Sequence, residues 1–301
     1  MSRIVFVSGA FLPFEEARVP ITDRGFLFSD GIYEVSAVLN GRLVDNAAHL
    51  ARLDRCLGEI RIPNPYPAAE WTRLMEELVR HNGLVEGLVY MQVTRGAAER
   101  DFAFPKDATP TVVMFTQAKV ITRSPQAETG VAVVTTPDLR WKRRDIKSVA
   151  LLAQVLAKQE AAEVGVFEAW MVEDGFVTEG SSSTAFIVTA DARVVTRPLS
   201  TAVLPGITRL AVMRLATERG LSVEERLFTV DEAHRAAEAF LTSASSFVMP
   251  VVAIDGRAIG TGKPGPLTRR LRQLYLEMAG APAAAARAGW EPSPDRRGSL
   301  P

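Results

Sequence analysis

The order of apolar and polar residues predicts strands and hairpins at the start of the chain, then two helices and two more strands. Residues 4–7 and 31–39 are apolar and rich in β-forming side chains. The second run ends at Asn40-Gly41, a pair that tolerates positive φ and is a strong hairpin signal. Strands are expected again at 88–94 and 111–116. Between them, apolar residues recur at the three- and four-residue spacing of two helix faces: Leu50, Leu53, Leu57 and Ile60, then Trp71, Leu74, Leu78 and Val79.

A polar segment at 121–130, which contains Pro125 and ends at Gly130, predicts a connector between α+β domains at 1–120 and 131–280. The second domain is expected to start with a strand at 131–135. A helix should then run from Ser148 to about Glu163, with Leu151, Leu152, Val155 and Leu156 on one face. Residues 281–301 combine prolines with an alanine run and predict a mobile tail. The other expected elements are strands at 167–172, 176–178 and 185–188, helices at 207–219, 230–237 and 267–279, and turns at Asp174-Gly175 and Asp255-Gly256.

The composition is that of a soluble globular protein, with 47% hydrophobic and 23% charged residues among 301. The 35 Lys and Arg residues balance 35 Asp and Glu residues, so no broad electrostatic footprint for nucleic acid is expected. One cysteine, Cys56, and three separated histidines argue against a disulfide framework or a metal centre. No apolar run approaches the ~20 residues of a membrane span. Since no signal peptide is evident either, we expect a cytoplasmic protein.

Three glycines, Gly260, Gly262 and Gly265, spell the dinucleotide-binding pattern G-x-G-x-x-G. That motif needs a preceding parallel strand in a βαβ unit. Here it follows a predicted hairpin and is interrupted by Pro264 and Pro266, so we interpret it as a loop before a helix. The sequence also lacks a P-loop, an H-E-x-x-H zinc motif and the G-x-S-x-G nucleophile elbow, which argues against a serine hydrolase.

Lys147 lies at the junction of a charged segment, 138–147, and a predicted apolar helix. An amine there is expected at a domain boundary, where nearby cations and partial removal from water favour its neutral, nucleophilic form. That form is the one that Schiff-base chemistry needs. A solvated basic segment fits the same residues, because charge runs usually face water.

Glu179 ends a predicted strand and is followed by Gly180 and four hydroxyl residues, 181–184. A carboxylate aimed inward there can pair with a pyridinium nitrogen, and the hydroxyls can bind an anion or a cofactor ring. Two further stretches suit a phosphate: 206–208 opens a helix with free N–H groups, and 242–246 is a turn of small hydroxyl residues. Each of these stretches also fits an ordinary polar turn or helix cap.

Taken together and in this order, these stretches resemble the class IV, fold-type IV pyridoxal-phosphate aminotransferases, and within that family the D-amino-acid transaminases. The resemblance covers about residues 1–280 and rests on several motifs. They are Asp23-Arg24-Gly25, Asp30-Gly31-Ile32-Tyr33-Glu34, His49-x-x-Arg52-Leu53, Gln92-Val93-Thr94-Arg95-Gly96, Asp145-Ile146-Lys147-Ser148, Thr178-Glu179-Gly180-Ser181-Ser182-Ser183, Leu204-Pro205-Gly206-Ile207-Thr208-Arg209 and Thr242-Ser243.

The resemblance implies an α+β, two-domain fold that holds pyridoxal 5'-phosphate in the interdomain cleft. Lys147 would form the internal aldimine and then move the proton between Cα and C4′. Glu179 would keep the pyridine nitrogen protonated. Arg52 would bind the phosphate, a role that suits its planar fork of donors. The other cofactor contacts implied by the resemblance come from Ser182, Ser183, Leu204, Ile207, Thr208, Ser243 and Ala244.

The substrate motif is less complete than the cofactor motifs. In D-amino-acid transaminases an Arg-x-His pair and a tyrosine receive the substrate carboxylate; here Arg100 and Tyr33 match, and Phe102 stands at the histidine position. One lost hydrogen bond to a charged acceptor is worth about 1.5–3 kcal/mol. We therefore expect weaker carboxylate binding or a shifted substrate range. A solvated loop charge is the alternative for Arg100.

These residues predict an enzyme that moves the amino group of a D-amino acid to an α-keto acid in a ping-pong cycle. The resemblance implies a homodimer with sites near the subunit interface, where Arg24 can reach the partner's site. An (R)-selective amine transaminase, a branched-chain amino-acid transaminase and an aminodeoxychorismate lyase share the fold and remain open. A binding protein without chemistry also remains open, although Lys147 and Glu179 argue against it. His49 is expected to support Arg52, and Cys56 to be a small core residue.

Overall fold

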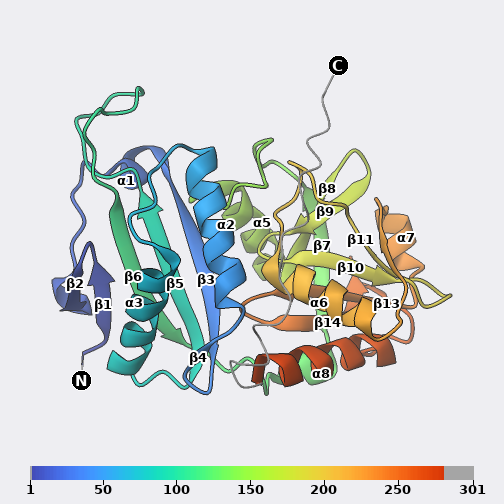
Figure 1. Ribbon diagram of the computed structural model, residues 1–301. Coiled ribbons are helices and arrows are strands. Elements are labelled where there is room, and N and C mark those ends of the chain that lie inside the picture. The colour runs from blue at the N-terminus through green and yellow to red at the C-terminus, as the bar shows by residue number, and fades with distance from the viewer. Residues whose placement is uncertain (1, 281–301) are drawn as a thin grey trace.

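The chain folds into two lobes, each built on its own β-sheet (Figure 1). The computed structural model describes residues 2–280, so the tail predicted at 281–301 lies outside the described residues. The elements of the first lobe are β1 (Ile4–Val7), β2 (Ala10–Pro13), η1 (Phe14–Glu16), α1 (Arg24–Phe28), β3 (Gly31–Leu39), β4 (Arg42–Leu43), α2 (Asn46–Glu59), α3 (Ala68–His81), β5 (Glu86–Thr94) and β6 (Thr111–Ala118).

The first sheet is antiparallel, with the strand order β2-β1-β6-β5-β3-β4. The hairpin predicted at Asn40-Gly41 joins β3 to β4, and both turn residues have positive φ, 50° and 71°. Helices α2 and α3 lie on one face of the sheet (Figure 1). The apolar faces expected from their spacing, Leu53 and Leu78 among them, are buried in one core with the sheet. Cys56 is also buried there, as predicted.

The second lobe contains a mixed sheet of nine strands within residues 131–258. Its strands follow the order β12-β11-β10-β13-β14-β7-β8-β9, and β15 pairs with β14. With the short helix that precedes it, the elements are α4 (Pro125–Thr129), β7 (Val131–Pro137), α5 (Leu152–Glu163), β8 (Glu168–Glu173), β9 (Phe176–Gly180), β10 (Thr184–Val188), β11 (Val194–Thr196), α6 (Ile207–Glu218), β12 (Val223–Glu225), α7 (Val230–His234), β13 (Glu238–Ser243), β14 (Phe247–Ile254), β15 (Arg257–Ala258) and α8 (Pro266–Gly280).

Helices α6 and α8 pack together and against the second sheet. Their core is shared between the lobes, because Leu39 of β3 and Leu88 of β5 pack into the same cluster as Val212 of α6 and Leu271 of α8. The first sheet ends with β6 and the second sheet starts with β7 along the chain. The exact domain limits, 1–120 and 131–280, stay a prediction. The glycines at 260–265 form the loop before α8, as expected.

The helix predicted from Ser148 begins four residues later, at Leu152. Residues 147–149 are extended and hydrogen-bond to the start of β3: Tyr33 N donates to Lys147 O and Val149 N donates to Gly31 O, both at 3.0 Å. Helical periodicity in the sequence does not register such pairing with a distant strand. The helix predicted at 230–237 likewise ends early, at His234.

The apolar stripe predicted for α5 is not buried in the chain. Leu152, Val155 and Leu156 are 72%, 58% and 52% exposed. The helix contacts β8 instead through its small residues, Ala157 and Ala161. An apolar stripe left open on a helix is typical of an interface with another molecule.

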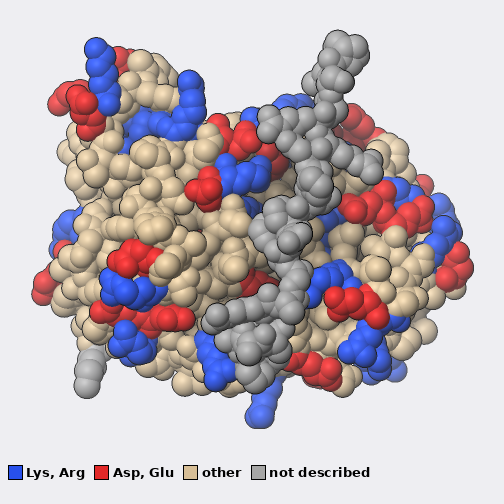
Figure 2. Space-filling model, in the orientation of Figure 1, with Lys and Arg blue, Asp and Glu red and all other residues tan. Residues whose placement is uncertain are grey.

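Charges of both signs are interspersed on the face of the molecule shown in Figure 2. Among the helices within residues 2–280, none is long and apolar enough to span a bilayer.

Candidate active site

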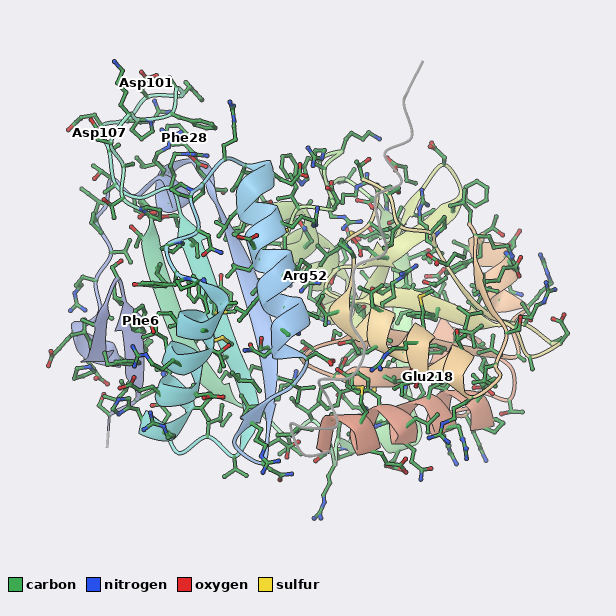
Figure 3. The ribbon with its side chains drawn as sticks, in the orientation of Figure 1. Phe6, Phe28, Arg52, Asp101, Asp107 and Glu218 are labelled. Atoms are coloured by element: carbon green, nitrogen blue, oxygen red, sulfur yellow. The ribbon has the colours of Figure 1, made fainter. Side chains whose placement is uncertain are left out.

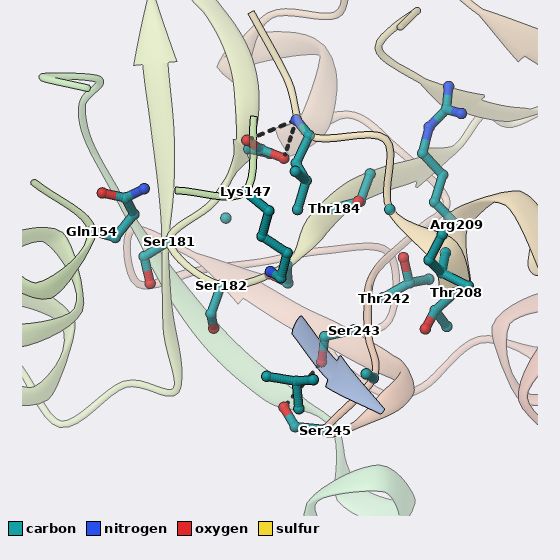
Figure 4. A pocket seen from close by; sticks show the side chains of 18 of the residues that line it. Lys147, Gln154, Ser181, Ser182, Thr184, Thr208, Arg209, Thr242, Ser243 and Ser245 are labelled. Atoms are coloured by element: carbon teal, nitrogen blue, oxygen red, sulfur yellow. Dashed lines mark hydrogen bonds between the residues drawn. The ribbon is translucent and has the colours of Figure 1, made fainter. Parts of the chain in front are cut away.

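A cavity of about 300 Å³ opens between the two lobes (Figure 4). Its walls come from β3, β5 and α2 of the first lobe and from residues 140–154, 179–184, 204–209 and 242–245 of the second. The predicted site residues that line it are Tyr33, Arg52, Lys147, Glu179, Ser182, Ser183, Leu204, Ile207, Thr208, Ser243 and Ala244.

Lys147 enters the cavity from the boundary of the lobes. Its carbonyl accepts from Tyr33 N, and its own N–H donates to Cys56 Sγ at 3.4 Å, so the backbone is held on both sides. The side chain is half-buried, and Nζ lies 4.1 Å from the centroid of the Tyr33 ring. Figure 4 shows the amine extending between Ser182 and Ser243. Lys147 is therefore positioned to react with a group held in the cavity.

Glu179 faces the same cavity from the end of β9 and is buried. Leu204 N donates to both of its carboxylate oxygens at 3.2 Å, and Arg140 donates to one of them. Burial raises the pKa of Glu179, and the Arg140 guanidinium opposes that rise. Arg140 is held in turn by Asp138 at 2.7 Å. Sequence reasoning missed Arg140 and Arg144, which both line the cavity, because nothing in a basic run marks which side chains turn inward.

Arg52 is fixed by a buried carboxylate, Glu34, on β3. Arg52 Nε and Nη2 donate to Glu34 at 2.6 and 2.8 Å, and His49 Nδ1 lies 2.8 Å from the same carboxylate. Burial alone would raise the pKa of Glu34, but Arg52 and His49 more than offset it and hold that pKa well below its usual range. His49 thus supports Arg52, as predicted. Glu34 ends the motif that starts at Asp30, but the sequence alone did not predict a role for it.

Donors suited to a phosphate meet at one end of the cavity. Arg52 uses three of its five N–H groups on Glu34 and on Pro205 O within residues 2–280, which leaves two. In the same range, no side chain caps the N-terminus of α6 at Gly206, so its first N–H groups are available to an anion. The Thr242 hydroxyl is buried on the cavity wall and has no partner among the described atoms.

These groups fit pyridoxal 5'-phosphate. Arg52, the N–H groups of Ile207 and Thr208, and the hydroxyl of Ser243 can hold the phosphate. Glu179 can accept a hydrogen bond from a protonated ring nitrogen, which would also favour its ionised form. The cavity is large enough for a small cofactor. Within residues 2–280, no group of His, Cys, Asp and Glu is arranged to hold a metal ion.

The serine cluster at 181–183 lines the cavity, and its hydroxyl groups donate to a carboxylate. Ser182 and Ser183 donate to Glu168 at 2.8 and 3.2 Å, and Ser181 donates to the same buried carboxylate. The hydroxyls are therefore anchored by Glu168, a residue that sequence reasoning passed over. This arrangement gives the cavity a rigid polar wall.

Arg24 and Arg100 do not line this cavity. Arg24 is buried, with Nε 2.8 Å from Asp30 and Nη1 donating to Asp101 O at 2.5 Å. The Arg100 guanidinium lies 5.2 Å from the Phe28 ring centroid, and its neighbour Phe102 is 78% exposed. Figure 3 shows Phe28 and Asp101 at a loop that projects from the first lobe, well away from Arg52. The residues matched to substrate binding are thus divided: Tyr33 is at the cavity and the two arginines are not.

We expect Glu34→Gln to loosen Arg52 and to lower the free energy of unfolding at pH 7 by about 3 kcal/mol, because it breaks a buried ion pair. The folded-state pKa of Glu34 lies below its ordinary value of 4.5. Its stabilising effect is therefore complete above that pH and is lost as the pH falls below it. The variant should accordingly lose less stability than wild type between pH 5 and pH 3.

Urea unfolding across this pH range checks the expectation, with the exposed Glu99→Gln as control. If the free energy of unfolding fell equally with pH in wild type and in Glu34→Gln, the expectation would be contradicted.

The comparisons with known proteins agree with this geometry. Residues 31–254 match the family model for class IV aminotransferases. The chain is 41% identical to a D-alanine aminotransferase of Bacillus licheniformis, over 89% of this chain and 94% of the relative. It is 38% identical to a D-alanine aminotransferase of Staphylococcus aureus (strain MSSA476), over 90% and 96% of the two chains.

Among solved structures, the fold is similar to a branched-chain aminotransferase of Thermoproteus uzoniensis solved with norvaline. The TM-score is 0.83 at 26% identity, covering 93% of this chain and 95% of that one. A second branched-chain amino acid aminotransferase, solved with pyridoxamine 5'-phosphate, gives a TM-score of 0.85 at 26% identity over 93% and 94% of the two chains. This chain has the fold-type IV, α+β architecture and is a member of the class IV aminotransferases.

Proposed function

We propose that the protein is a D-amino-acid transaminase that uses pyridoxal 5'-phosphate to move an amino group from a D-amino acid to an α-keto acid. The observation that carries the proposal is the convergence of Lys147, Glu179 and Arg52 on one cavity, from three distant parts of the chain. The relatives of 36–41% identity named D-alanine aminotransferases support a D-amino acid as the donor. The cytoplasmic location stays a prediction.

When bound, the cofactor supplies an aldehyde that condenses with amines and a ring that accepts electrons from the substrate Cα. Lys147 Nζ would supply the amine that anchors it and, once released, would carry the proton to and from Cα. Glu179 would accept a hydrogen bond from the protonated ring nitrogen, and Arg140, which donates to this carboxylate, would favour its ionised form. Arg52 and the start of α6 would orient the phosphate, and Leu204, which lines the cavity, would lie against the ring.

A branched-chain amino-acid transaminase is the second candidate, because the similar solved structures of 25% identity or more carry that name. The higher identity to D-alanine aminotransferases favours the first candidate.

We also propose a homodimer in which each projecting loop serves the partner's cavity. The exposed stripe of α5, Leu152, Val155 and Leu156, supports a subunit interface. Leu139 and Trp141 are also exposed apolar residues. Arg100 lies on the projecting loop rather than at the cavity of its own chain. Arg24 supports that loop by binding the carbonyl of Asp101.

Replacement of the cavity amine tests the chemistry. Wild type with pyridoxal 5'-phosphate should show a visible absorbance band that borohydride removes, and the reduced cofactor should be found on the peptide that contains residue 147. Lys147→Ala should lose both signals and all transamination. Lys142→Ala, whose side chain is 83% exposed, should keep them. A cofactor adduct on another lysine of wild type would refute the assignment.

Subunit complementation tests the shared site. Arg100→Ala should reduce kcat/KM for D-alanine about 10- to 150-fold, as the loss of a charged carboxylate contact predicts, and should spare simple amines. Mixed dimers of Lys147→Ala and Arg100→Ala chains should regain one complete site and therefore much of the activity. Lys106→Ala, on the same loop, is the control. A chain that is monomeric in solution, or mixed chains that recover no transaminase activity, would contradict the proposal.

A further inference from the structure

Tyr275 is a buried residue of α8 that connects the two lobes near the phosphate end of the cavity. It is 1% exposed, and its hydroxyl donates to Asp45 Oδ2 at 2.6 Å. Asp45 is the residue before α2 and has a positive φ of 51°. Since α2 carries Arg52, this bond joins α8 of the second lobe directly to the helix that presents the guanidinium.

Helix α8 also packs against α6, the second helix that faces the phosphate end, and Tyr275 lies in the same buried cluster as Val212 and Leu215 of α6. Burial raises the pKa of Tyr275 well above its usual value, and Asp45 adds to that rise. The phenol therefore stays protonated and able to donate. Tyr275 thus binds the start of α2 by a hydrogen bond and packs in the buried cluster that includes α6.

Helix α8 also holds the turn that carries Ser243 and Ala244. Arg272 Nη1 donates to the carbonyls of Ser246 and Val248 at 2.9 and 2.8 Å, and Nη2 donates to Ile121 O at 2.6 Å. Phe247, which has a φ of 58°, packs its ring 4.9 Å from the ring of Tyr275. Helix α8 therefore contacts all three segments that carry phosphate donors: the start of α2, helix α6 and the turn at 243–246.

A phosphate bound between the lobes requires that its donors on both lobes be aligned. Arg52 belongs to the first lobe, while the start of α6 and the 243–246 turn belong to the second. One phosphate can satisfy all of them only if the lobes are held in register within a fraction of an ångström. Apolar packing between the lobes is not directional. The hydrogen bond from the buried Tyr275 hydroxyl to Asp45 is directional and can therefore fix how the lobes are aligned.

We propose that Tyr275 is a positioning residue that, through its hydrogen bond to Asp45 and its packing in the core shared with α6, aligns α2 with α6 and thereby sets the affinity of the site for the phosphate group. The inference rests on the proposed function, since it takes pyridoxal 5'-phosphate as the ligand.

Binding to the cofactor-free protein tests it, with pyridoxal 5'-phosphate and with pyridoxal, which lacks the phosphate. Tyr275→Phe removes the hydroxyl but keeps the ring that packs on Phe247. We expect its Kd for pyridoxal 5'-phosphate to rise about tenfold, the equivalent of one charged hydrogen bond. Its Kd for pyridoxal should change less than about twofold. Inorganic phosphate should compete less effectively with the cofactor in the variant than in wild type.

Two further variants sharpen the result. Tyr66→Phe, a partly buried tyrosine of the first lobe outside this cavity, should leave both affinities unchanged. The double variant Tyr275→Phe with Asp45→Asn should bind no more weakly than Tyr275→Phe alone, because both changes remove the same link.

If Tyr275→Phe weakened the binding of both ligands equally, or of neither, Tyr275 would contribute only to core packing, and the inference would be overturned. A wild-type chain that binds no pyridoxal 5'-phosphate would instead overturn the proposed function, and this inference with it.

Discussion

The site depends on the short extended pairing between residues 147–149 and the start of β3. Two backbone hydrogen bonds there tie the lobes together beside the cavity. Because side chains alternate across a strand, β3 then presents Tyr33 toward the Lys147 amine and Glu34 toward Arg52. A single strand thus positions residues beside both the amine of Lys147 and the guanidinium of Arg52.

The buried charges of the site are compensated in pairs. Arg52 is held by Glu34, and Glu179 by Arg140. Removing either partner would leave an uncompensated buried charge, which is costly. Neither pair is fully satisfied by itself, because Arg52 keeps donors and Glu179 keeps acceptor capacity toward the cavity. That residual capacity is what a ligand with an anion at one end and a ring N–H at the other can use.

Local periodicity in the sequence was enough to predict α2, α3 and α8, because each has one apolar face and clear boundaries. The resemblance also assigned site roles to eleven residues that line the cavity. Features that depend on distant partners were not predictable: the late start of α5, the inward turn of Arg140 and the support that Glu34 gives to Arg52. The stripe of Leu152, Val155 and Leu156 shows a further limit, since spacing does not distinguish a core face from a face left open for a partner.

The central claim is that this cavity takes the amino group of a D-amino acid. The most direct measurement incubates the purified protein and pyridoxal 5'-phosphate with 2-oxoglutarate and either D- or L-alanine, and determines the configuration of the glutamate formed. The account predicts pyruvate and D-glutamate from D-alanine, with negligible product from L-alanine. Formation of L-glutamate from L-alanine or from a branched-chain L-amino acid, with no reaction of D-alanine, would contradict it.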